Sequence, residues 1–217
     1  MPLFSSQFAI STQTESSWDT YLDSFTPTTN YHDSSSLEIR RINNKNNTHR
    51  LRRVLLAFDL SGQVGRIITS ATLTMKTVGG FSLFGSSVPC TIARWDSQTD
   101  PVYNEANWTK GASIFSRDWD GADAAFTAGA ITATLDWPRT VNTTFTSGGL
   151  TNMLDQGRGL TTNDPMVFLI IKLTDETAPN VIPAAIGHDE DALSSSPIDV
   201  PILNIVSEVD HRKVFRR

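Results

Sequence analysis

The densest group of metal-ligating side chains lies in the stretch Asp118-Trp-Asp-Gly-Ala-Asp123. Asp118, Asp120 and Asp123 place three carboxylates around a glycine, and closely spaced oxygen ligands at such a turn suit a hard cation such as Ca²⁺. The EF-hand pattern is not met, because Gly129 stands where its bidentate glutamate would fall. The stretch therefore predicts either a solvated Asp-rich turn or a structural Ca²⁺ site.

No local pattern points to nucleophilic or phosphate chemistry. Cys90 lies between Val88 and Ile92 with no base beside it, so we expect a buried, unreactive thiol. A Gly-X-Ser-X-Gly elbow and a phosphate-binding glycine loop are both missing from the sequence. The polar run His188–Asp191 lacks zinc-protease spacing and is more typical of an exposed loop. The sequence favours a non-enzymatic protein without a cofactor.

The chain has five tryptophans, many for its length. Sugar C–H faces stack on aromatic rings, so an exposed tryptophan can form a platform for a glycan. Trp95 and Trp137 are the candidate platforms, with burial in the core as the alternative.

Two basic runs could contact a partner. The first contains Arg50, Arg52 and Arg53, and we expect it to be a solvated face. The second is the C-terminal tail, where basic and aromatic anchors suit an arm that docks on an acidic neighbouring subunit. Its candidate docking residues are Arg212, Lys213, Phe215, Arg216 and Arg217.

Length and composition restrict the class of protein. A chain of 217 residues is within the range of one all-β domain, and its single cysteine excludes an intrachain disulfide. The formal net charge of −5 disfavours nucleic acid as the main partner. The N-terminus lacks the features of a Sec signal, and no apolar stretch approaches the ~20 residues of a membrane span. We therefore expect the protein to be made in the cytoplasm of a cell.

Hydrophobic residues recur with period two, as in half-buried strands. The clearest such segments are 54–60, 71–76 and 131–136, with shorter ones at Leu37–Ile39 and Leu203–Ile205. Met166–Leu173 is a more continuous apolar run, interrupted only by Lys172, and it predicts a central strand covered on both faces. The pattern predicts an all-β, antiparallel, jelly-roll-like β-sandwich.

One short helix is predicted among these strands. Leu150, Met153 and Leu154 have i, i+3, i+4 spacing, with Ser147 as a candidate N-cap and Gly157 as a candidate end. The sequence shows no linker or repeat. We expect an N-terminal arm at 1–14, one sandwich domain at 15–208 and a basic tail at 209–217.

The order of several segments resembles that of DNRLRE-type β-sandwich domains. These segments are Asp19–Asp23, Arg53–Ser61, Thr69–Met75, the loop with Trp108, Trp119 and Gly121–Asp123, and Pro201–Ile205. The resemblance covers residues 15–208, although no literal Asp-Asn-Arg-Leu-Arg-Glu string occurs. The resemblance implies a β-sandwich fold. The family includes both carbohydrate-binding-module-like domains and stand-alone phage virion proteins.

These observations lead to two hypotheses. The first is a virion structural protein, such as a capsid decoration, neck or fibre-base subunit, that is made in the host cytoplasm and docks onto other capsid subunits. A homo-oligomer is then expected, because assembly proteins act by symmetric repetition. The second is a carbohydrate-binding or adhesion module with a polysaccharide as its ligand.

Overall fold

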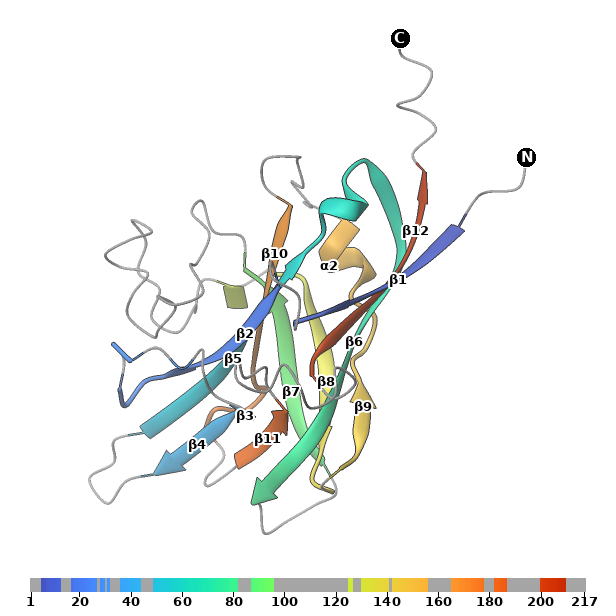
Figure 1. The fold of residues 1–217 in the computed structure, drawn as a ribbon. Coiled ribbons are helices and arrows are strands. Elements are labelled where there is room, and N and C mark those ends of the chain that lie inside the picture. The colour runs from blue at the N-terminus through green and yellow to red at the C-terminus, as the bar shows by residue number, and fades with distance from the viewer. Residues whose placement is uncertain are drawn as a thin grey trace.

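The structure is a computed structural model in which two antiparallel sheets face each other (Figure 1). It describes residues 5–12, 17–26, 28–29, 31, 36–43, 49–81, 87–95, 125–126, 130–140, 142–155, 165–177, 182–186 and 200–209. This confirms the predicted all-β sandwich.

The first sheet has the strand order β1-β12-β6-β11-β3, and β9 also pairs with β6. β6 is its longest strand and lies at its centre. The strands are β1 (Ser5–Ser11), β3 (Ser36–Glu38), β6 (Arg66–Phe81), β9 (Thr144–Thr146), β11 (Ile182–Ile186) and β12 (Ile202–Val209).

The second sheet has the order β2-β5-β10-β7-β8, and β4 also pairs with β5. The short 3-10 helix η1 (Ser61–Gln63) follows β5 and leads back into the first sheet. The strands are β2 (Trp18–Asp23), β4 (Arg40–Asn43), β5 (His49–Asp59), β7 (Ser87–Arg94), β8 (Thr132–Pro138) and β10 (Met166–Leu173).

The main core lies between the two sheets and follows the predicted period-two pattern. Val54, Leu56 and Phe58 of β5 are fully buried in it, opposite Leu73 and Leu203 of the first sheet. Because successive side chains of a strand point to opposite faces, this alternation fixes which face of each sheet is interior. Ile131 differs from the prediction: β8 begins one residue later, and Ile131 is exposed.

The second sheet is also covered on its outer face. Leu55, Trp95, Phe168 and Ile170 form a second apolar cluster there, with Ala125 packed against it. This explains the long apolar run of β10, because Val167, Leu169 and Ile171 point into the main core while Phe168 and Ile170 point into this cluster. The prediction of a central strand covered on both faces is confirmed.

The predicted helix exists as α2 (Thr151–Asp155), and Leu150, Met153 and Leu154 are buried in the main core. Ser147 is not its N-cap, because the helix begins four residues further on. The Ser147 hydroxyl oxygen instead accepts the Leu73 N–H of β6 at 3.0 Å. Among the described residues, no helix has the length and apolar character that crossing a bilayer requires.

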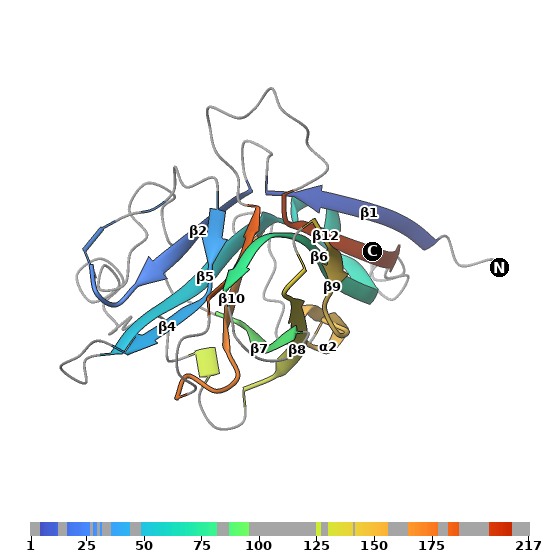
Figure 2. The ribbon, with the colours of Figure 1, turned by 90° about the horizontal axis from the view of Figure 1, so that it is seen from below.

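The N-terminal segment is part of the sheet rather than an arm over residues 5–11. β1 pairs with β12 along its whole length, from Ser5 opposite Glu208 to Ser11 opposite Ile202. Figure 2 shows β1 along the outer border of the molecule, with β12 beside it. The sandwich therefore includes residues that we predicted to precede it.

Candidate functional site

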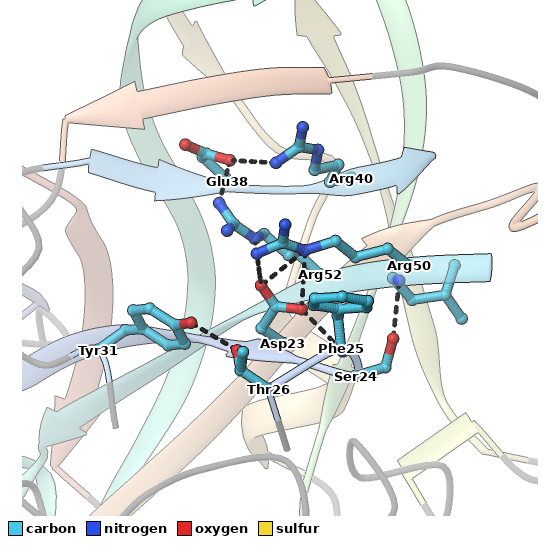
Figure 3. Close-up of polar contacts among 10 residues, drawn as sticks. Asp23, Ser24, Phe25, Thr26, Tyr31, Glu38, Arg40, Arg50 and Arg52 are labelled. Atoms are coloured by element: carbon cyan, nitrogen blue, oxygen red, sulfur yellow. Dashed lines mark hydrogen bonds and ion pairs between the residues drawn. The ribbon is translucent and has the colours of Figure 1, made fainter. Parts of the chain in front are cut away.

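The most concentrated charged cluster of the described chain is built around Asp23, at the end of β2 (Figure 3). The register places Asp23 directly opposite Arg52 of β5, so their side chains share one face of the sheet. Arg50 lies two residues from Arg52 and therefore points to that same face. The alternation of β5 directs this face toward the interior of the sandwich.

The Asp23 carboxylate is fully buried and accepts several hydrogen bonds. Arg52 Nε donates to Oδ2 at 2.7 Å, Arg50 Nε donates to Oδ2 at 3.0 Å, and the Phe25 N–H donates to Oδ1 at 2.9 Å. Burial by itself would raise the pKa of Asp23, but the hydrogen bonds from Arg50, Phe25 and Arg52 outweigh it and hold that pKa below its ordinary value. The carboxylate is therefore ionised, and both of its oxygens already accept hydrogen bonds from the protein.

Arg52 also connects the two sheets. Its Nη1 donates to Oε2 of Glu38, which belongs to β3 of the first sheet, whereas Arg52 belongs to β5 of the second. Arg40 of β4 lies 3.9 Å from the same Glu38 oxygen. The charged cluster therefore ties β2, β3, β4 and β5 together, and we call it the Asp23 clamp.

Aromatic rings cover the Asp23 clamp. The Arg52 guanidinium lies 4.6 Å from the ring centroid of Tyr21, which stacks on Tyr31 at 4.3 Å. Arg50 lies 5.1 Å from the ring centroid of Phe25. Burial raises the pKa of Tyr21 to about 12, so its hydroxyl stays protonated. The contact with Tyr21 stabilises Arg52 in a buried setting, whereas Phe25 is 58% exposed and its contact with Arg50 is open to water.

The prediction that Arg50, Arg52 and Arg53 form a solvated face is wrong. Arg52 and Arg53 are only 8% and 3% exposed. Arg53 points to the outer face of the second sheet, where its Nε and Nη2 each donate to Glu176 at 2.8 Å. Arg53 and Lys172 also lie beside the ring of Phe126. The physical reason is that each arginine has a carboxylate partner that the fold brings from a distant segment.

The candidate ligand platforms Trp95 and Trp137 are both interior. Trp137 has no exposed surface and lies against Phe145 with a centroid distance of 5.2 Å. Trp95 is 5% exposed and packs edge-on against Phe168 on the outer face of the second sheet. A glycan needs a ring face open to solvent, and neither tryptophan offers one. Their role in this structure is apolar packing.

Cys90 is buried as predicted, at 1% exposure. Burial raises the pKa of its thiol far above the ordinary value, and the charge of Asp136 adds to this. Its Sγ donates a weak hydrogen bond to the Val88 carbonyl at 3.6 Å. A thiol that cannot ionise is a poor nucleophile, so Cys90 is an inert core residue.

A shallow depression of about 390 Å³ lies on the first sheet. Its lining residues are all neutral, and they come from three neighbouring strands, β1, β6 and β12. They are Gln7, Phe8, Ala9, Ser70, Thr72, Asn204, Ile205 and Val206. Without a titratable lining group the depression offers no acid or base, although its hydroxyls and amides could contact a polar ligand.

Several predicted residues lie outside the described part of the chain. They include the candidate Ca²⁺ ligands Asp118, Asp120 and Asp123, and the candidate docking residues Arg212, Lys213, Phe215, Arg216 and Arg217. Within the described ranges, no three His, Cys, Asp or Glu side chains are grouped so as to hold a metal ion. The calcium and tail predictions therefore stay predictions.

The Asp23 clamp was not predicted, although the sequence carries a signal for it. Asp19, Tyr21 and Asp23 share one parity in β2, and Arg50 and Arg52 share one parity in β5. Pairing of two such strands brings opposite charges together.

No protein-family model matches the chain, and no curated protein sequence matches it.

Proposed function

We propose that this chain is a non-enzymatic structural subunit of a virion, docking onto a larger assembly. The observation that carries the proposal is the distribution of charge. Three of the buried ionisable groups, Asp23, Arg52 and Arg53, are engaged in ion pairs, whereas the depression beside β1 is neutral. Such an arrangement suits a rigid body that presents a surface, rather than a site that moves protons.

The virion assignment has separate support from the sequence. The segment order resembles DNRLRE-type domains, among whose stand-alone relatives are phage virion proteins. The tail residues Arg212, Lys213 and Phe215 supply the charged and aromatic anchors that an acidic neighbouring subunit would bind.

Sedimentation of a native lysate through a density gradient tests this function, with the chain followed by mass spectrometry. A virion subunit co-sediments with particles in the megadalton range. A chain found only at the top of the gradient, as a free small protein, would contradict the proposal. Because Val209 is the last residue of β12, the tail deletion begins at residue 210. Deletion of residues 210–217 should release the chain from the particles without unfolding it, and unchanged attachment would exclude the tail as the docking arm.

A carbohydrate-binding function is the second candidate, and the depression is the observation that favours it. Asn204 and Thr72 line it and could hydrogen-bond sugar hydroxyls. Retention of the chain on immobilised polysaccharides should then fall in Asn204→Ala and Thr72→Ala. The matched control is Thr132→Ala, an exposed position on β8 of the other sheet. Equal retention of all three variants would contradict a glycan site in the depression.

A further inference from the structure

β1 forms one edge of the first sheet among the described residues, and it has none of the features that normally block strand pairing. Natural sheets protect their edges with charges, prolines, bulges or very short strands. β1 has the sequence Ser-Ser-Gln-Phe-Ala-Ile-Ser, with no charge and no proline. Its register against β12 runs without a shift over seven residues.

The other described edges are protected in these ways. β3 and β9 have three residues each, and β4 carries Arg40 and Arg41 among its four. β8 contains Asp136 and ends at Pro138. β2 contains Asp19 and Asp23. β1 is therefore the described edge strand with the least protection against a second strand.

The hydrogen-bond pattern shows which backbone groups of β1 point away from the sheet. The Thr12 N–H donates to the Pro201 carbonyl at 3.1 Å, so position 12 faces β12. Because this direction alternates along a strand, Phe8 and Ile10 also direct their backbone groups toward β12. Gln7 and Ala9 direct theirs away from it. No described strand pairs with that side of β1.

We propose that the free edge of β1 pairs with β1 of a second copy of this chain, antiparallel and centred on Phe8. This inference rests on the proposed function, because the pairing would join copies of the chain within the assembly. In this register Gln7 lies opposite Ala9 of the other copy, and both positions have outward-pointing backbone groups. The pairing is two-fold symmetric, so β1 of each copy supplies the backbone hydrogen-bond partners for β1 of the other.

The side chains of β1 also suit a second copy. Ile10 packs toward the main core, and Phe8 has the same parity, so both point to the core-facing side. Phe8 is nevertheless 37% exposed. The symmetric register places Phe8 opposite Phe8 of the other copy, which covers apolar surface that the single chain leaves in water. β1 itself has no charged side chain for a charged partner to bind, although the Arg66 guanidinium of β6 lies 5.5 Å from the Phe8 ring centroid.

The first test is the mass of the purified full chain by sedimentation velocity at micromolar concentration. The proposal predicts a dimer, twice the 23.9 kDa of the single chain. Ala9→Pro removes one outward N–H and leaves the bonds to β12 intact, so it should raise the dimer dissociation constant about tenfold or more. Ala9→Ser keeps the N–H and should dimerise like the unchanged chain.

A charge-swap experiment separates loss of pairing from loss of folding. The double variant Gln7→Lys with Ala9→Lys sets like charges opposite one another and should be monomeric, as should Gln7→Glu with Ala9→Glu. Mixing the two places lysines opposite glutamates and should restore a dimer. Misfolded variants would not be rescued in this way.

Three results would overturn the proposal. They are a monomeric unchanged chain, a dimer that Ala9→Pro leaves intact, and charge variants that do not pair when mixed. The first of these includes a monomer whose β1 pairs only with a different particle protein. In that case co-sedimentation with particles would persist, so the pairing proposal would fail while the proposed function stood.

Discussion

Asp23 and Arg52 lie directly opposite each other on β2 and β5, and Arg52 Nε donates to Asp23 Oδ2 at 2.7 Å across 29 residues of sequence. The same guanidinium donates to Glu38 in the other sheet. A single buried arginine thus joins the two layers at one end of the sandwich. This end has no disulfide to hold it, because the chain has only one cysteine.

Removing the charge of Asp23 should destabilise the fold strongly. In Asp23→Asn the buried Arg52 loses one of its two carboxylate partners and Arg50 loses its partner as well. Breaking a buried ion pair from one side costs about 3 kcal/mol or more. Urea denaturation followed by tryptophan fluorescence measures the loss. Asp136→Asn, at an exposed position on β8, is the matched control and should change stability little. Equal stability of the two variants would show that the clamp does not hold the sheets together.

The same residue predicts how stability depends on pH. The pKa of Asp23 is lower in the folded chain than its ordinary value of 3.8, so the unfolded chain binds this proton more readily. The contribution of Asp23 is therefore complete above the ordinary pKa and is lost as the pH falls through the lower, folded value. The stability difference between the unchanged chain and Asp23→Asn should shrink over that acidic range. A difference independent of pH would contradict this prediction.

Trp137 should act as a core residue rather than as a ligand platform. Trp137→Ala opens a cavity between the sheets and should cost about 3–5 kcal/mol in unfolding free energy. Ile131→Ala, at a position 43% exposed just before the same strand, should cost far less. If Trp137→Ala kept its stability and lost retention on a polysaccharide, the ring would have to be a binding platform after all.

Cys90 should not react with thiol reagents while the protein is folded. Its burial excludes the reagent, and its raised pKa excludes the thiolate. Labelling with a maleimide at neutral pH should therefore be slow in buffer and stoichiometric in urea. Rapid labelling of the native chain would show that β7 opens readily from the sheet.

The sequence predicts the layers of this fold well, because period two is a local property. The alternation of Val54, Leu56 and Phe58 identifies the interior face of β5. The apolar run Met166–Ile171 of β10 predicts that both faces of this strand are covered by apolar residues. The sequence did not predict β1 as a strand, because an edge strand has only one pairing partner and a weak apolar pattern. Its order depends on β12, almost two hundred residues away.

The candidate site could be predicted far less well, because it depends on contacts between distant segments. The local sequence predicts that Arg53 is a surface residue, because its partner Glu176 lies 123 residues further on. Serine is a common helix N-cap residue, yet the hydroxyl oxygen of Ser147 accepts a hydrogen bond from the N–H of Leu73 in β6. In each case a tertiary partner takes the group that the local pattern had assigned elsewhere.

The central claim, that this chain is a structural subunit of a particle, is tested most directly by its copy number in purified particles. Quantitative mass spectrometry gives the ratio of this chain to the most abundant particle protein. A structural subunit occupies symmetric positions, so the ratio should be fixed and reproducible between preparations and after a high-salt wash. A ratio that varies between preparations or falls to zero on washing would contradict the claim.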